Sequence, residues 1–272
     1  MKYLSLPVTA QDDENVVIDL TNEPEWSAYK SRWITAYKNY YTYEGNPFAL
    51  IPENFGTVIE KRQYKLYDTR RNSGELARMR RRKGLLSCPV CGSPVTGSLD
   101  HYLPRTVYPE FSIMRANLVP ACSHCNSGAK GKIVPSKKPA RFIHPYYDKW
   151  ADDPLWAVRI KKPFKAARFC PIPFPTLKGR KLKIVKFHLE NVFGDQFDLS
   201  MDNKWSTYPR VIRSRLNNSS INQKDIESQV KKDLREAKVT NGTNSWYAAF
   251  FRGILLDNSA LKFIHSEVVV DV

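Results

Sequence analysis

Two Cys-x-x-Cys pairs constrain the fold of this chain more than any other feature of its sequence. They are Cys88 with Cys91, and Cys122 with Cys125. Two residues between the cysteines of each pair is the spacing of the chelating turns that supply thiolates to a tetrahedral Zn²⁺. We therefore expect the four cysteines to bind one structural zinc and to bring two separate segments of the chain together.

The composition indicates a globular protein that attracts polyanions. The chain has 272 residues, 42% of them hydrophobic, which is ample for one large core or two smaller ones. Its formal net charge is +16 and its pI is about 9.6. Nucleic acid is the commonest partner of such a charge, and a membrane surface is the weaker alternative.

Several sequence features favour a cytoplasmic location without a membrane partner. No apolar run approaches the roughly 20 residues of a membrane-spanning helix. The first residues turn acidic before the apolar core of a signal peptide develops. Four of the five cysteines have metal-binding spacing, as expected in a reducing compartment, and Cys170 is expected to be an ordinary thiol.

Changes in composition divide the chain into three regions. We expect a basic helical region at 1–84, a zinc-clamped core at 85–150 and a basic region of mixed helices and strands at 151–272. Aromatic residues at helical spacing predict a helix that is capped by Asn22 and buries its aromatic face. Further helices are expected from Thr57, after Ser73, from Ser220 and after Ser245. Residues 181–190 are expected to form a strand, and 266–272 an edge strand or a free end.

Two basic stretches are candidates for contact with phosphates, although many charge runs are only solvated faces. The first directly precedes the first cysteine pair and consists of Arg80, Arg81, Arg82 and Lys83. The second, residues 159–186, contains no acidic residue.

The segment between the cysteine pairs is longer than in simple zinc ribbons, and it carries polar residues suited to hydrolysis. Asp100 and His101 lie in an apolar, extended stretch at 99–104, and Asn117 begins a second short strand at 117–120. Cys125 and Asn126 then open a short helix. Hydrolysis of a phosphodiester needs a deprotonated water and a cation, for which neutral imidazole and oxygen ligands are the appropriate groups.

This order of strand, loop, strand and helix resembles the HNH endonuclease family with its ββα-metal fold, in its zinc-stabilised branch. About fifty residues carry the resemblance, and the matching positions are Asp100, His101, Pro104, Asn117, Leu118, Cys122, Cys125, Asn126 and Lys130. It implies an α+β fold with a zinc-stabilised nuclease core, a helical N-terminal region and a mixed α/β C-terminal region.

The same resemblance implies the catalytic roles. His101 is expected to be the general base, Asp100 and Asn126 the ligands of a catalytic divalent cation, and Asn117 the residue that pins the loop between the strands. Many family members have histidine where Asn126 stands. Fewer nitrogen ligands favour Mg²⁺ or Mn²⁺ over zinc or nickel as the catalytic ion.

The expected substrate is DNA. Arg105, Arg115, Lys130 and Lys132 flank the site and are expected to contact phosphates, although solvent exposure would also explain them. One nuclease motif per chain predicts a nick in one DNA strand. A double-strand break would require a homo-oligomer or two separate cleavage events at the same site. The flanking pattern is most similar to stand-alone bacterial HNH proteins, some of which accompany ATPases in antiviral defence against phage. An ATPase partner is expected on that basis.

Two alternatives remain open. A zinc-dependent nucleic-acid-binding protein without catalysis would tolerate alanine at Asp100 and His101. A ribonuclease would use the same metal site, and the aromatic N-terminal helix could support a single-stranded substrate. Outside the site, His124 is expected to be exposed and not a zinc ligand, and His144 is expected to pack against Tyr146 and Tyr147.

Overall fold

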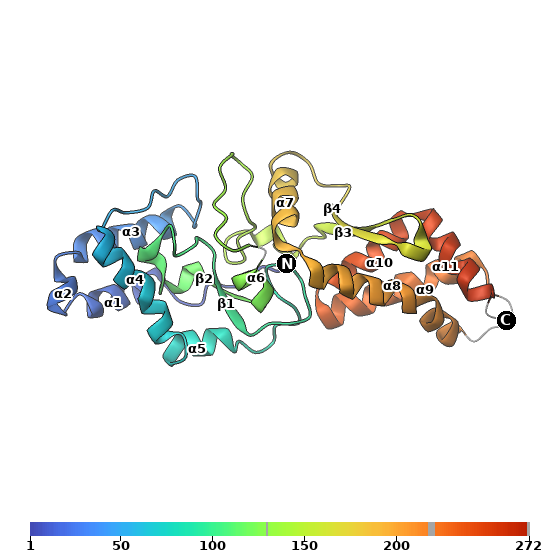
Figure 1. Cartoon of the computed structure of the whole chain (residues 1–272), viewed down its shortest axis with the longest axis horizontal. Helices are drawn as coiled ribbons and strands as arrows, with labels where there is room; N and C mark the ends of the chain where they lie inside the picture. The colour runs from blue at the N-terminus through green and yellow to red at the C-terminus, as the bar shows by residue number, and fades with distance from the viewer. Residues whose placement is uncertain (129, 217–220, 271–272) are drawn as a thin grey trace.

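The chain folds into an elongated α+β structure (Figure 1). The computed structural model describes residues 1–128, 130–216 and 221–270. The N-terminal helices lie at one end, two short strands and the cysteine-bearing helix lie near the middle, and the C-terminal helices lie at the other end. Buried hydrophobic side chains from all three regions belong to one connected core. Among the described residues, no helix has both the length and the apolar character that crossing a bilayer requires.

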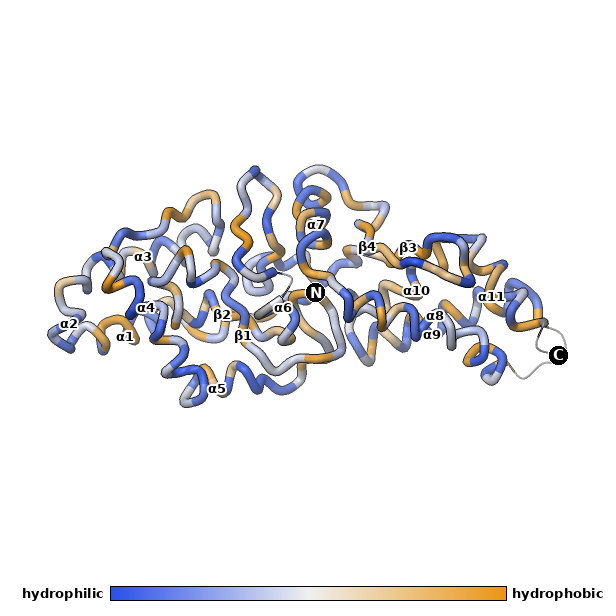
Figure 2. Tube along the Cα trace, in the orientation of Figure 1, coloured by the Kyte–Doolittle hydropathy of each residue, from blue (hydrophilic) through white to orange (hydrophobic). Residues whose placement is uncertain are grey.

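Five helices form the N-terminal region: α1 (Ala10–Leu20), α2 (Pro24–Ser27), α3 (Lys30–Thr42), α4 (Thr57–Arg70) and α5 (Gly74–Arg80). The predicted helices from Thr57 and after Ser73 are confirmed. Hydrophobic and hydrophilic residues are interspersed along the trace (Figure 2). The predicted burial of the aromatic face is also confirmed, because Trp26, Trp33 and Tyr40 are buried.

The predicted helix cap at Asn22 is wrong. Asn22 lies in the turn after α1, and Glu23 is the N-cap of α2, because Pro24 occupies the first helical position. Helix α2 ends at Ser27 and α3 begins at Lys30, so the aromatic residues lie on two helices and not on one.

An antiparallel pair of strands and a short helix form the middle of the molecule. Strand β1 (Ser98–His101) pairs with β2 (Leu118–Ala121), so that Asp100 faces Val119 and His101 faces Leu118 across the ladder. Helix α6 (Ser123–Ser127) follows β2 directly and packs against β1. The two strands and the helix occur in the predicted order, but their bounds differ from the prediction. Strand β1 ends at His101 and not at residue 104, and α6 begins at Ser123 because Cys122 caps it. Asn117 ends the 3₁₀ turn η2 (Arg115–Asn117) and precedes β2.

Within its described residues, the C-terminal region contains a β-hairpin and five α-helices. The hairpin is β3 (Trp156–Lys161) with β4 (Arg168–Pro173), and the helices are α7 (Gly179–Val192), α8 (Asp195–Leu216), α9 (Gln223–Asn241), α10 (Trp246–Leu256) and α11 (Asn258–Val270). Helix α10 packs closely on β3, because Gly253 has no Cβ that would clash with the carbonyl oxygen of Val158. The predicted helix after Ser245 is confirmed, with Ser245 as its N-cap.

Two elements of the C-terminal region differ from the prediction. Residues 181–190 are helical and not a strand, and the buried residues Ile184, Val185 and His188 share the packed face of α7. Residues 266–270, which were expected to form an edge strand or a free end, belong instead to α11, and residues 271–272 lie outside the described residues. Ser220, the predicted start of a further helix, lies outside the described residues, and α9 is capped by Asn222.

Candidate metal centre and catalytic pocket

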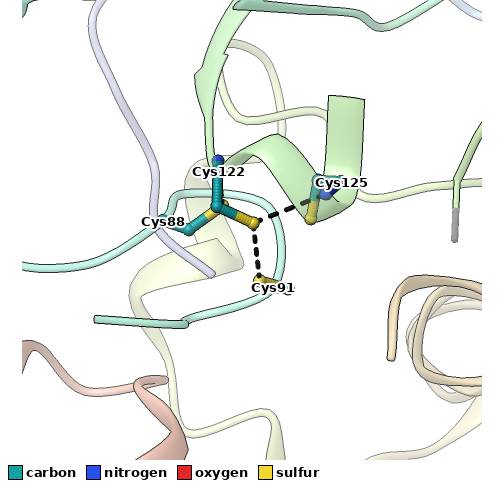
Figure 3. Close-up of side chains that lie close together, drawn as sticks. All are labelled: Cys88, Cys91, Cys122 and Cys125. Atoms are coloured by element: carbon teal, nitrogen blue, oxygen red, sulfur yellow. Dashed lines mark hydrogen bonds between the residues drawn. The ribbon is translucent and has the colours of Figure 1, made fainter. Parts of the chain in front are cut away.

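The four cysteines of the two pairs form one buried cluster. Their Sγ atoms all lie within 4.8 Å of one another, and Figure 3 shows the thiols pointing toward a common centre. Cys91 Sγ lies 3.7 Å from Cys122 Sγ. Zn–S bonds of about 2.3 Å in a tetrahedron place the sulfurs about 3.8 Å apart, so this spacing fits zinc. The cluster is therefore a four-thiolate site that could hold a structural Zn²⁺.

Backbone groups and a helix cap fix the cysteine side chains. Cys122 is the N-cap of α6, and its Sγ accepts a hydrogen bond from Cys125 N at 3.4 Å. Cys122 N donates to Cys88 Sγ at 3.3 Å. These bonds orient the thiolates and spread their negative charge, as second-shell donors do at metal sites.

The first cysteine pair is attached to the C-terminal region, which the sequence did not indicate. Trp246 Nε1 donates to Cys91 O at 2.9 Å, and Trp246 N donates to Gly92 O at 3.0 Å. His188 Nε2 donates to Val90 O at 2.8 Å. Loss of the cluster would therefore also loosen the contacts of α7 and α10 with the middle of the molecule.

Three of the four predicted catalytic residues line one cavity of about 350 Å³. Asp100 and His101 come from β1, and Asn126 comes from α6. Helix α4 and two loops supply the rest of the lining: Tyr64, Tyr67, Arg71, Pro104, Arg105, Thr106, Gly131 and Lys132. The chain thus gathers a carboxylate, an imidazole and an amide in one solvent-accessible pocket with several basic side chains.

His101 is held as a neutral imidazole with one defined tautomer. Its Nε2 lies 2.8 Å from Ser112 O, and a carbonyl oxygen only accepts, so Nε2 carries the proton and Nδ1 keeps its lone pair. Burial lowers the pKa of His101 to about 3. The ring also packs edge-on against Tyr67, with centroids 4.6 Å apart. At neutral pH, His101 is therefore neutral, with an unprotonated Nδ1.

Asp100 is a buried carboxylate with an internal cation beside it. Lys130 Nζ lies 3.1 Å from Asp100 Oδ2. Burial raises the pKa of Asp100 to about 6, and the ammonium of Lys130 opposes that rise. Asp100 is therefore mostly ionised at pH 7 and loses its charge below about pH 6.

The side chain of Lys130 is directed into the protein and not toward a substrate phosphate. Its side chain is almost completely buried, and Nζ donates to His101 O at 2.6 Å besides pairing with Asp100. The predicted exposed phosphate contact at Lys130 is therefore wrong. Its charge is directed inward because β1 presents both the carboxylate and the backbone oxygen to it.

Lys130→Met is expected to lower the free energy of unfolding by about 3 kcal/mol, since breaking a buried ion pair leaves the carboxylate of Asp100 without compensation. Urea unfolding of the zinc-loaded chain at pH 7.5 measures the effect. Lys132→Met is the control, because Lys132 is exposed and its loss should change stability by less than about 0.5 kcal/mol. Equal stability of the two variants would contradict the buried pair.

Asn117 is fully buried and does not line the cavity. Its Oδ1 accepts from Leu103 N at 2.8 Å and from Tyr40 Oη at 3.1 Å. Its Nδ2 donates to Leu103 O at 3.0 Å and to Phe111 O at 3.3 Å. The amide thus ties together the loop between β1 and β2 and has no free group to offer a substrate.

Asn126 is oriented by the beginning of β1. Its Nδ2 donates to Ser98 Oγ at 2.7 Å, which identifies Oδ1 as the atom available to a cation. The side chain is half-buried at the cavity wall. Asp100 and Asn126 therefore offer oxygen ligands of the kind that Mg²⁺ and Mn²⁺ prefer.

Some of the residues predicted to contact phosphates line the cavity and others do not. Arg105 lines the cavity, but its guanidinium already pairs with both oxygens of Asp68 at 3.0 and 3.1 Å. Lys132 is exposed at the same cavity. Arg71, which was not among the predicted phosphate contacts, also lines it.

Other basic residues lie away from this cavity. Arg80, Arg81, Arg82 and Lys83 are at least partly exposed at the end of α5 and beyond it, and none of them lines the pocket. Arg115 is buried, and its Nε donates to Asp13 Oδ1 at 2.8 Å, so the predicted phosphate contact at Arg115 is wrong.

The predicted packing of His144 is confirmed. Its buried ring lies 4.7 Å from the ring of Tyr147 and 5.9 Å from that of Tyr146, measured between centroids. His124 is half-buried, so its expected exposure is wrong, and it is not part of the cysteine cluster.

Comparison with known proteins finds a short similarity to a phage protein. The chain is 49% identical over 63 residues to protein ea31 of Escherichia phage lambda. The match spans 23% of this chain and 21% of the phage protein, so the chain covers about a fifth of that relative. No family model matches the chain, and no solved structure matches it.

Proposed function

We propose that this chain is a metal-dependent endonuclease of the HNH type that hydrolyses phosphodiester bonds in DNA. The observation that carries the proposal is the single cavity that His101, Asp100 and Asn126 line together. The order of β1, β2 and α6 beside a four-cysteine cluster supports a zinc-stabilised ββα-metal core. The net charge of +16 supports a polyanionic substrate.

In the proposed reaction, His101 Nδ1 removes a proton from a water molecule as the water oxygen attacks phosphorus. The bond from phosphorus to the leaving oxygen breaks, and that oxygen takes a proton from solvent. Ser112 O holds the imidazole in the required tautomer throughout. Asp100 and Asn126 would hold Mg²⁺ or Mn²⁺, which supplies stabilisation of the charge that develops on the phosphate and the leaving oxygen.

The affinity for the divalent cation is expected to fall at acidic pH. A cation binds the ionised carboxylate, and the pKa of Asp100 is raised to about 6, so protons compete below that pH and affinity falls about tenfold per pH unit. His101, with its pKa lowered to about 3, stays neutral over this range and contributes no loss. Calorimetric titration with Mn²⁺ at pH 7.5, 6.0 and 5.0 tests this. Unchanged affinity between pH 7.5 and 5.0 would contradict it.

A cleavage panel tests the function itself. Zinc-loaded chain is incubated with supercoiled plasmid, single-stranded DNA and RNA, each in Mg²⁺, Mn²⁺ and EDTA. Metal-dependent cleavage of DNA supports the proposal, and cleavage of RNA alone would identify the ribonuclease alternative. Binding of nucleic acid without cleavage of any substrate would favour the non-catalytic zinc protein.

A partner ATPase and a role in antiviral defence remain predictions from the sequence resemblance. Cleavage of plasmid by the purified chain alone would contradict a strict requirement for such a partner.

A further inference from the structure

We propose that a second cavity, next to the candidate catalytic pocket, is a subsite for one unstacked nucleotide adjacent to the scissile phosphate. This inference rests on the proposed nuclease function and deepens it, because it selects single-stranded or locally unpaired nucleic acid as the substrate. The second cavity has a volume of about 520 Å³. Helix α4 and the segment before it, with the loop that follows β1, form its walls.

The two cavities are adjacent. Tyr64, Arg105 and Thr106 line both of them. A strand whose phosphate lies at His101 would therefore bring a neighbouring nucleotide to the second cavity. This adjacency is the reason for assigning a nucleotide, and not an unrelated small molecule, to the second cavity.

Tyr64 and Arg105 form a stacked pair whose surface lines both cavities. The guanidinium of Arg105 lies 3.9 Å from the centroid of the Tyr64 ring. Arg105 is fixed there because it pairs with Asp68 and also donates to Tyr64 O at 2.9 Å. Nucleobases stack on tyrosine rings and on guanidinium planes, and each such contact contributes about 1–3 kcal/mol. A base that enters the cavity would find this surface already ordered.

The charges around the second cavity favour a phosphodiester chain. Lys61 and Lys65 line it and are exposed, and within the described part of the chain neither forms an ion pair. Of the two acids in the lining, Glu53 pairs with Arg32 at 3.6 Å, whereas Glu60 Oε1 accepts a hydrogen bond from Phe55 N at 3.2 Å and keeps its negative charge. The two lysines therefore outnumber the one carboxylate of the lining that has no ion pair among the described residues.

The proposed subsite would take a base only when that base is neither paired nor stacked. A base within a continuous duplex lies against its neighbours, and it reaches a protein cavity only after it leaves the stack. Single strands and transiently opened segments of supercoiled DNA avoid most of that cost. The subsite would consequently make cleavage depend on local unpairing.

Binding experiments with the full zinc-loaded chain test the subsite without requiring cleavage. The probes are one oligodeoxynucleotide carrying 2-aminopurine and the same strand annealed to its complement, both in Ca²⁺. Tyr64→Leu is expected to weaken binding of the single strand about tenfold and to leave duplex binding unchanged. Tyr64→Phe, which keeps the ring, and Tyr43→Leu, which removes an exposed tyrosine elsewhere, are expected to bind like wild type.

The outcomes separate the subsite from the proposed function. If wild type binds the probes but Tyr64→Leu keeps the wild-type ratio of single-strand to duplex affinity, the subsite is overturned and the nuclease proposal stands. If wild type binds neither probe, both fail. Lys65→Gln, an exposed substitution that does not threaten folding, is expected to weaken single-strand binding severalfold, and no effect there would also contradict the subsite.

Discussion

Cys122→Ser is expected to abolish stoichiometric zinc binding and to unfold β1, β2 and α6 before the rest of the chain. The two strands have four residues each and the helix has five, so this unit cannot be stable from its own backbone hydrogen bonds. Cys122 joins β2 to α6 as the helix cap and belongs to the thiolate cluster. Structural zinc contributes about 10–16 kcal/mol in small peptide systems, and a three-cysteine site would lose much of that.

Zinc content by elemental analysis and hydrogen exchange of the β1 amides measure this effect. Cys170→Ser is the matched control, because Cys170 lies on β4 and outside the cluster, so zinc content and exchange should both remain as in wild type. Removal of zinc from wild type with a chelator should reproduce the Cys122→Ser exchange pattern. Wild-type protection of β1 in the variant would show that the cysteines do not hold this part of the fold.

His101→Ala is expected to lower the rate of metal-dependent cleavage by about 10²- to 10⁴-fold, the usual contribution of a general base. The affinity for Mn²⁺ should stay within about twofold, because Asp100 and Asn126 are the proposed ligands. Single-turnover cleavage at saturating metal measures the rate, and calorimetry measures the affinity. Asp100→Asn should show the opposite pattern, because it changes a proposed ligand and should therefore lower the affinity for Mn²⁺.

His265→Gln is the matched control for His101→Ala. His265 lies on α11, where its Nε2 is bonded to Ile221 O, and it lines neither cavity near the site. The His265→Gln variant should cleave DNA at the wild-type rate. A His101→Ala rate within a few-fold of that control would remove His101 from the proposed mechanism.

The metal cluster and the elements that carry the pocket could be predicted because their signals are local. The two-residue spacing of the cysteines indicates a chelating site regardless of the remaining fold. The apolar residues around Asp100 and the residues after Asn117 indicate short strands. In contrast, the apolar and basic residues of 181–190 are compatible with the spacing of a strand and with that of a helix. Only the packing of α7 against the rest of the chain selects the helix.

The parts of the pocket that the sequence did not indicate depend on tertiary contacts. Burial of Lys130 requires that its loop fold back on β1, and no local pattern distinguishes it from the exposed Lys132. Tyr64 and Arg71 reach the pocket only because α4 packs beside β1, although their spacing suggests an ordinary basic helix. Asn117 is tied to Tyr40, 77 positions away in the sequence.

The most direct test of the proposed function is nicking of supercoiled plasmid by zinc-loaded wild type and by His101→Ala, in Mn²⁺ and in EDTA at matched zinc content. The proposal predicts nicked circles only for wild type in Mn²⁺. Intact plasmid under every condition, with both proteins bound to it, would contradict a nuclease that acts alone on DNA and would favour a zinc-dependent nucleic-acid-binding protein.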